Sequence, residues 1–220
     1  ISKMNFIATT ALKKILQMKK KIRDVRGSTG AGKTMGITMW DIDFAQSLPN
    51  QIIDVVSESY PHLDQGVTRD FKNIMIANKY WKDDLWNEMG IYSFESGSIL
   101  EFISFDKFGK AHGPRRDVLF INEANNIPYN IVDQLITRTR KIVWLDWNPI
   151  EDFWFYENML GNRDDIDFMG EGGNYPPLTY LDNEQLDETS RKEIEIHKNN
   201  KQWWDIYGLG KRGILQGRIY

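Results

Sequence analysis

The feature that most constrains this chain is a glycine-rich loop near its N-terminal end. It reads Gly27-Ser28-Thr29-Gly30-Ala31-Gly32-Lys33-Thr34 and matches G-x-x-x-x-G-K-[ST] at every fixed position. Glycines let the backbone wrap tightly, so that its N–H groups point at phosphate oxygens. Lys33 supplies a positive charge for the β- and γ-phosphates, and the Thr34 hydroxyl can ligate Mg²⁺. The pattern predicts that this loop, from Gly27 to Thr34, binds ATP with Mg²⁺.

The rest of the chain fits the fold that such a loop requires. Short apolar segments alternate with helical ones, which is typical of a parallel α/β sheet. The expected strands are 22–25, 52–56, 118–121 and 142–145, and a hairpin of 91–94 with 99–105 turns at Ser96-Gly97-Ser98. The expected helices are 33–46, 68–79, 129–137, 153–160 and 184–199, with a loop at 170–177.

These elements predict an α/β P-loop NTPase of the additional-strand (RecA/ASCE-like) type. Its mainly parallel central sheet is flanked by helices and carries an inserted β-hairpin. We expect residues 1–220 to form a single domain, with 1–20 as a helical or extended lead-in. The first strand is the weakest part of this prediction, because the sequence from Lys21 to Arg26 is too polar for a central strand. Its position before the loop, rather than its composition, makes it a strand.

Composition narrows the class of protein. Hydrophobic residues make up 41% of the 220 residues, an ordinary globular balance, and no stretch is apolar enough to span a bilayer. The chain has no cysteine, which rules out disulfides and thiolate metal sites, and its 3 histidines are too scattered to suggest a zinc site. A net charge of −3 is unlike that of a DNA-coating protein, so any DNA contact must come from local patches.

An apolar strand ending in polar residues follows the loop, as hydrolysis requires. Val118-Leu119-Phe120-Ile121 leads directly into Asn122 and Glu123. Glu123 lies at the carboxyl end of the strand, where open α/β sheets place their ligands, and we expect it to orient and deprotonate the attacking water. Asn122 stands where an aspartate is usual. Its amide oxygen can accept a hydrogen bond from a metal-bound water but brings no charge, so we expect weaker affinity for Mg²⁺.

The next expected strand ends in Asp146-Trp147-Asn148-Pro149. A polar side chain at that point can sense the γ-phosphate and relay its loss to distant elements. Asn148 and Asp146 are both candidates, and a plain turn before Pro149 is the alternative.

Several segments, taken in order, resemble the large terminase subunit of tailed bacteriophages. The resemblance runs from about Arg26 to the C-terminus. It rests on Arg26 before the loop, on Gly97-Ser98-Ile99 in the hairpin, on the basic turn Gly113-Pro114-Arg115-Arg116-Asp117, on Asn122-Glu123-Ala124-Asn125, on 144–149, on Thr179-Tyr180-Leu181-Asp182-Asn183 and on 204–213. Only the phosphate loop is specific by itself, and the ordered set carries the resemblance.

The resemblance implies a DNA-packaging motor in the host bacterial cytoplasm. Such a motor hydrolyses ATP to move double-stranded DNA into a procapsid, as a homo-oligomeric ring docked on the portal protein and served by a small terminase subunit. Residues 205–220 would begin a linker to a nuclease domain of the same protein, and the isolated domain would be a monomer without a membrane partner. Arg26 would stabilise transition-state charge in cis, and Arg115 or Arg116 from a neighbouring subunit. The alternative for each arginine is a surface position or a structural salt bridge. The family also places its adenine contact before the loop, which makes Gln17 or its neighbours candidates.

Three other functions share the phosphate loop. A small-molecule kinase would need an arginine-rich lid and no strand-end glutamate. Another P-loop motor, such as a helicase, would not respond to portal protein. A nucleotide-binding module with weak or no hydrolysis is suggested by Asn122.

Overall fold

A computed structural model describes residues 6–105, 115–150 and 152–213. Two compact units make up the chain: one contains Ile1–Ile7 and Thr34–Leu145, and the other contains Ala8–Lys33 and Asp146–Tyr220. Gly113 and Pro114 of the basic turn, the start of the lead-in and residues 214–220 of the expected linker lie outside the described residues.

The described residues of the first unit form five strands in the order β3-β4-β2-β5-β6. Their bounds are β2 Ile52–Ser57, β3 Ile91–Ser93, β4 Ile99–Ser104, β5 Arg116–Ile121 and β6 Thr139–Trp147, whose last two residues belong to the second unit. Strands β4, β2, β5 and β6 are parallel to one another. All of β5 and nearly all of β2 are buried, as expected for mainly apolar strands in a sheet covered on both faces.

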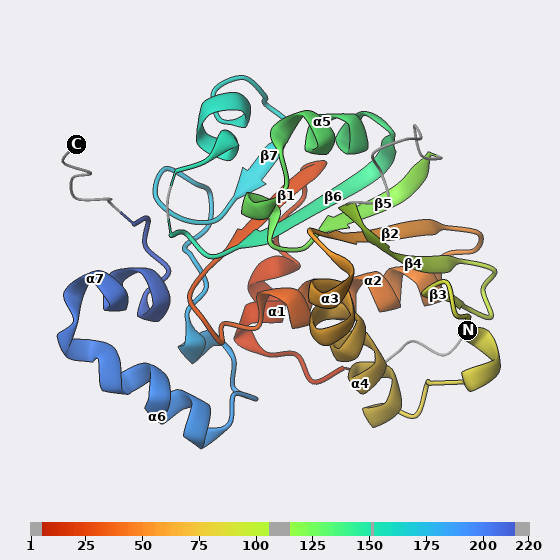
Figure 1. The fold of residues 1–220 in the computed structure, drawn as a ribbon, viewed down its shortest axis with the longest axis horizontal. Helices are drawn as coiled ribbons and strands as arrows, with labels where there is room; N and C mark the ends of the chain where they lie inside the picture. Colours follow the sequence, from red (N-terminus) through yellow and green to blue (C-terminus); the bar gives the residue numbers. More distant parts are fainter. Residues whose placement is uncertain (1–5, 106–114, 151, 214–220) are drawn as a thin grey trace. The chain divides into compact units, whose positions relative to one another are not determined.

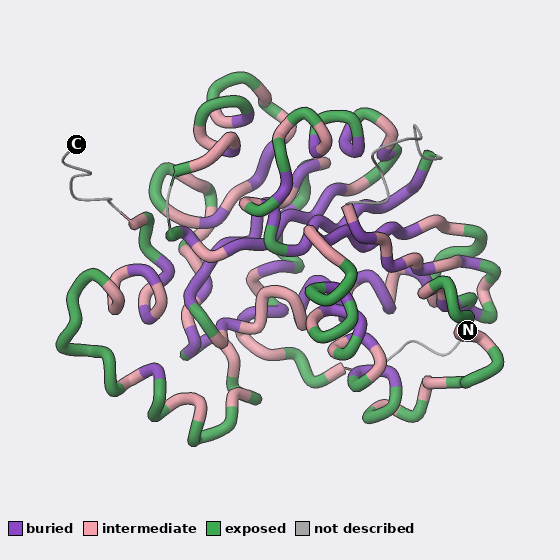
Figure 2. Tube along the Cα trace, viewed as in Figure 1, coloured by how far each residue is buried: buried purple, intermediate pink, exposed green. Residues whose placement is uncertain are grey.

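Helices cover this sheet. They are α2 Lys33–Ser47, α3 Tyr60–Leu63, α4 Arg69–Ala77 and α5 Tyr129–Thr137, with short helical turns η1 Asp64–Thr68, η2 Asp83–Leu85 and η4 Ala124–Asn126. In Figure 1, α5 lies on one side of the strands and α2, α3 and α4 lie on the other. Figure 2 shows β2 and β5 as buried along nearly their whole length. Apolar side chains on one side of α5 explain its placement, because Val132, Leu135 and Ile136 are its buried residues.

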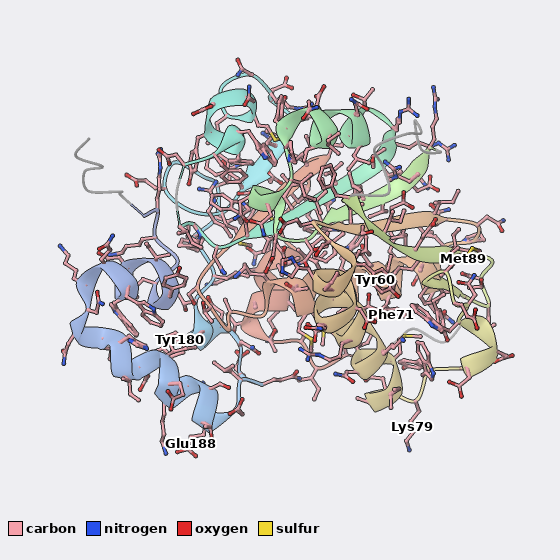
Figure 3. The ribbon with its side chains drawn as sticks, in the orientation of Figure 1. Tyr60, Phe71, Lys79, Met89, Tyr180 and Glu188 are labelled. Carbon is pink, nitrogen blue, oxygen red and sulfur yellow. The ribbon has the colours of Figure 1, made fainter. Side chains whose placement is uncertain are left out.

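The expected hairpin is present, although it is built into the main sheet. β3 and β4 are antiparallel, joined by a turn in which Gly97 has φ +83°, while the other edge of β4 pairs in parallel with β2. An aromatic cluster packs here around Phe71 of α4, which Figure 3 labels. Its other members are Trp81, Tyr92, Phe94 and Phe102, with ring centroids 5.3–6.5 Å from that of Phe71.

The second unit contains β1 Ile22–Arg26 and β7 Ile166–Phe168, which pair in parallel. Its helical elements are α1 Thr10–Ile15, η5 Phe155–Met159, η6 Tyr180–Asp182, α6 Glu188–Ile196, η7 His197–Asn199, α7 Lys201–Trp203 and η8 Trp204–Gly208. The polar strand β1 is buried because its charged residues are paired: Arg26 donates from Nε to Asp24 Oδ2 at 3.0 Å. This pairing explains how a strand of such composition is tolerated.

Several sequence-based bounds need correction. The helix expected at 153–160 is only the π-helical turn η5, and the one expected at 184–199 is α6, which begins after Asp187. Asp187 caps it by accepting from the Ser190 N–H at 2.9 Å. Strand β7 and the helical turns at 60–63 and 201–203 were not predicted, because each is too short to show a period. None of the helices in the described ranges is long and apolar enough to cross a membrane.

Candidate nucleotide site

The phosphate loop has the backbone that its glycines predict. Gly30 and Gly32 have φ values of +71° and +79°, in the left-handed region that favours glycine. A Cβ on Gly27 would lie 2.4 Å from the carbonyl oxygen of Leu178, so only glycine fits there. Helix α2 begins at Lys33, which places a helix N-terminus directly after the loop. Backbone N–H groups and a helix N-terminus together suit a bound anion.

Lys33 lies among oxygen acceptors in the second unit. Its ammonium donates to the carbonyl oxygens of Gly27 at 3.1 Å and Ser28 at 2.9 Å, and to Oδ1 of Asn148 at 2.8 Å. The structure thus brings together Lys33 and Asn148, two residues selected independently from the sequence. Phosphate oxygens would compete with Asn148 for this ammonium, so the amide is placed to respond when a phosphate arrives or leaves. Asp146, the other candidate, is buried.

Residues 179–184, nearer the C-terminus, pack against the phosphate loop. The Asn183 side-chain NH₂ donates to the Gly30 carbonyl at 2.9 Å, and the N–H of Tyr180, labelled in Figure 3, donates to Ser28 Oγ at 2.8 Å. Asp182 pairs with Lys14 at 2.8 Å, and Thr10 donates to Glu184 from both its hydroxyl and its N–H. Those hydrogen bonds lower the pKa of Glu184 to about 2.

These contacts connect the lead-in helix α1 to the loop through residues 179–184. Residues 179–183 were noted in the sequence only through the resemblance to terminases. No spacing of residue types could have predicted their contact with the loop, across more than 150 residues. Gln17, the adenine candidate, is exposed, and its carbonyl accepts from the Tyr175 hydroxyl at 2.9 Å. Its role in adenine binding stays a prediction.

In the first unit, the candidate hydrolytic residues surround one cavity of about 290 Å³. Thr34, Asn122 and Glu123 line it together. The other lining residues come from the segment after β2: Pro61, His62, Gln65, Gly66, Val67 and Asp70. The cavity lies at the carboxyl end of β5, where parallel sheets place their ligands.

Glu123 has an unusual backbone. Its φ of 52° and ψ of 54° lie in the left-handed region, which is uncommon for a residue with a side chain. Such strain persists only where the surrounding structure enforces it, and it concentrates at functional sites. Asn126 Nδ2 donates to Glu123 Oε2 at 3.3 Å, so the carboxylate is also oriented by a neighbour.

The cavity also fits a hydrated magnesium ion. Its lining offers a hydroxyl, amide oxygens and carboxylates, the oxygen ligands that Mg²⁺ prefers. Within the described ranges no group of three or more histidine, cysteine, aspartate or glutamate side chains could hold a metal directly.

Arg26 is held inside the second unit, with only 2% of its surface exposed. Besides its bond to Asp24, it donates from Nη1 to the Tyr156 hydroxyl at 2.8 Å. Four aromatic rings, of Trp147, Phe155, Tyr156 and Phe168, lie 4.8–5.2 Å from its guanidinium carbon. Burial raises the pKa of Asp24, and Arg26 opposes part of that rise. In this arrangement Arg26 must leave these contacts before it can act on a phosphate.

The two arginines proposed to act on a neighbour differ in placement. Arg115 is exposed, whereas Arg116 is buried and pairs through Nε with Asp54. Burial raises the pKa of Asp54, and Arg116 opposes the rise. The Arg116 guanidinium also donates to the Leu135 carbonyl at 3.2 Å. Arg116 is thus held inside this unit, which makes Arg115 the better placed of the two to act on a neighbour. The catalytic role of either arginine stays a prediction.

Comparison with known proteins places this fold. No family model and no curated protein matches the sequence. Among solved structures, the large terminase from a thermophilic bacteriophage, in complex with ADP, matches with a TM-score of 0.72 and 19% identity over 94% of this chain. The chain spans 54% of that protein's length. The same phage protein was also solved with ATP-gamma-S.

Two further structures agree. The large terminase ATPase domain of Thermus phage P74-26 matches with a TM-score of 0.62 and 12% identity, covering 91% of this chain and 92% of that domain. The Phi-28 gp11 DNA packaging motor matches with a TM-score of 0.53 and 14% identity, covering 93% of this chain and 68% of that one. The chain therefore has an α/β P-loop NTPase fold with a mainly parallel sheet flanked by helices, which confirms the expected class. More particularly, the fold is that of large terminase ATPase domains.

Proposed function

We propose that this chain is an ATPase whose hydrolysis of ATP powers the movement of double-stranded viral DNA into a procapsid. The observation that supports it most is the shared cavity of Thr34, Asn122 and Glu123. A hydroxyl that can ligate Mg²⁺, an amide that can hold a metal-bound water and a carboxylate that can act as base are the parts that water attack on a γ-phosphate requires.

Each residue then has a defined task. The loop from Gly27 to Gly32 and Lys33 bind the phosphates. Thr34 and Asn122 would hold a hydrated Mg²⁺, which would supply positive charge to neutralise the phosphate oxygens. Glu123 takes a proton from the attacking water. The oxygen of that water bonds to the γ-phosphorus as the bond between this phosphorus and the ADP oxygen breaks. Asn148 responds to loss of the γ-phosphate through Lys33. Arg26 in cis and Arg115 from a neighbour are the candidates for stabilising transition-state charge.

The packaging role rests on the structural neighbours, which are terminases and a packaging motor. We propose that the two units together form one ATPase domain, a monomer alone and a homo-oligomeric ring on a portal protein. A small terminase subunit, a nuclease domain of the same protein and a host cytoplasmic location belong to this proposal.

The test is ATP hydrolysis by the purified chain, with and without portal protein or proheads. We expect slow Mg²⁺-dependent hydrolysis that portal or proheads stimulate, and no hydrolysis by Lys33→Ala, which lacks the charge facing the phosphates. Near-wild-type turnover in Lys33→Ala would contradict the assignment of residues 27–34 as a phosphate-binding loop. Stimulation by DNA but not by portal would favour another P-loop motor.

Asn122 favours a second candidate, a nucleotide-binding module with weak or no hydrolysis. Without the usual aspartate, the metal site carries less negative charge. ATP binding with no turnover under any of these conditions would support this alternative.

A further inference from the structure

One carboxylate in the cavity has no role in the proposed reaction. The lining contains two acidic residues, Glu123 and Asp70. Glu123 is assigned to the attacking water, and Asp70 comes from helix α4, more than 50 residues earlier in the chain. Asp70 therefore shares a cavity with Thr34 and Asn122, the residues proposed to hold Mg²⁺.

The position of Asp70 is fixed by its neighbours. Phe71, the next residue, is completely buried, and its ring lies 5.3 Å from that of Phe102 and 5.4 Å from that of Tyr92. The chain before α4 is sharply bent, with φ −105° and ψ −110° at Gly66. The buried side chain of Val67 follows this bend. These contacts hold the first turn of α4 against the sheet, so the Asp70 carboxylate is held at the cavity wall.

The electrostatic environment of Asp70 suits a cation. Burial raises its pKa, and the neighbouring Arg69, whose charge favours the ionised form, opposes the rise. A partly desolvated carboxylate gains more from a nearby positive charge than one in water. His62 also lines the cavity. Its Nδ1 lies 3.3 Å from Oε2 of Glu58, an acidic residue that does not itself line the cavity.

We propose that Asp70 is a positioning residue that supplies the negative charge missing at Asn122, by accepting a hydrogen bond from a water bound to Mg²⁺. This inference rests on the proposed ATPase function. A metal-bound water needs an acceptor on the protein, and a carboxylate is a stronger acceptor than an amide. Charge from α4 thus compensates for the amide at the end of β5.

The test measures how Mg²⁺ promotes binding of a fluorescent ATP analogue, without requiring turnover. Loss of a group that holds a metal's ligands typically costs 10–100-fold in metal affinity. We expect Asp70→Asn to raise the Mg²⁺ concentration for half-maximal binding by about 10–100-fold, while binding without Mg²⁺ stays unchanged. Asp64→Asn is the matched control, because Asp64 is exposed, precedes the same helix and does not line the cavity.

A second variant separates charge compensation from a folding defect. Adding Asn122→Asp to Asp70→Asn returns a carboxylate to the site, so the Mg²⁺ titration should recover towards wild type. A merely structural loss in Asp70→Asn would not be rescued in this way. An unchanged titration in Asp70→Asn, or no recovery in the double variant, overturns the role of Asp70 but leaves the ATPase intact. Failure of the wild-type chain to bind the analogue at all would overturn both.

Discussion

At the scale of single residues, Asn122 and Glu123 are neighbours at the end of one strand but have different proposed roles. Asn122 and Glu123 follow β5 directly, yet Glu123 turns into the left-handed region while the N–H of Asn122 continues the ladder to the Val56 carbonyl at 2.9 Å. The chain therefore bends at Glu123. In the proposed reaction, this bend would let Asn122 face the metal while Glu123 faces the attacking water.

Glu123→Gln should retain ATP binding and lose hydrolysis. The substitution preserves shape and removes the base, so turnover is expected to fall by about 10²–10⁴-fold. Steady-state hydrolysis and equilibrium binding of ATP, measured on the same preparation, check this. A parallel fall in binding and turnover would instead assign Glu123 to the metal site or to the fold.

Arg26 has a structural role that hides any catalytic one. Arg26→Met leaves Asp24 buried and unpaired, which typically costs about 3–5 kcal/mol and should lower the unfolding temperature. The double variant Asp24→Asn, Arg26→Met should regain most of that stability, because the amide can still accept from Trp147 Nε1. If Arg26 also acts on phosphate, hydrolysis stays low in the double variant despite restored stability. Full recovery of hydrolysis would limit Arg26 to a structural role.

At the scale of elements, helix α2 contains a buried acid that the fold does not satisfy. Asp41 is 0% exposed, and neither of its carboxylate oxygens has a hydrogen-bond partner among the described residues. Burial raises its pKa well above the usual value. A raised pKa in the folded state means that stability is fully present below the unfolded pKa, about 3.9, and falls as pH rises towards the folded value.

Asp41→Asn removes this titration from the helix. The stability of the variant relative to wild type should therefore increase as pH rises from about 4. Chemical unfolding of both proteins across a pH series measures the difference. A difference that stays constant over the series would show that the pKa of Asp41 is the same in the folded and unfolded protein, so that burial does not raise it. Asp43→Asn, a less buried change on the same helix, is the control.

At the scale of the whole molecule, the rate of ATP hydrolysis should depend on contact between neighbouring subunits. An arginine delivered in trans is typically worth about 10³–10⁵ in rate. Arg115 is exposed and can be presented in this way, whereas Arg116 is held by Asp54. Specific activity should therefore rise with protein concentration or on adding portal. Arg115→Ala should abolish the rise and leave ATP affinity nearly unchanged.

Mixing two inactive variants tests the neighbour directly. Arg115→Ala mixed with Glu123→Gln should regain activity, because some interfaces then combine an intact base with an intact arginine. A mixture that stays inactive where wild-type subunits assemble would exclude Arg115 as the group acting across an interface. Arg116→Ala is expected to unfold more readily instead, since it leaves Asp54 buried without its partner.

The local sequence was sufficient for the phosphate loop, for α2 and α5 and for the hairpin. Glycine spacing and apolar periods act over a few residues, so they can be recognised without knowing the fold. Glu123 and Asn122 were proposed in the same way, from the strand that they follow, and their roles stay predictions. The missed elements, such as β7, are too short to carry such a period.

Only the tertiary structure decided which side chains meet. The sequence did not indicate that Arg26 and Arg116 would be buried and Arg115 exposed. In the structure, Asp24 pairs with Arg26 and Asp54 pairs with Arg116, both in buried ion pairs. Asn183 contacts Gly30, and Asp70 shares a cavity with Asn122, across sequence separations that no local pattern spans. The physical reason is that burial and charge pairing depend on neighbours in space. The sequence by itself therefore determined the α/β fold class and predicted a nucleotide site, whereas the packing of distant segments decided which side chains lie together there.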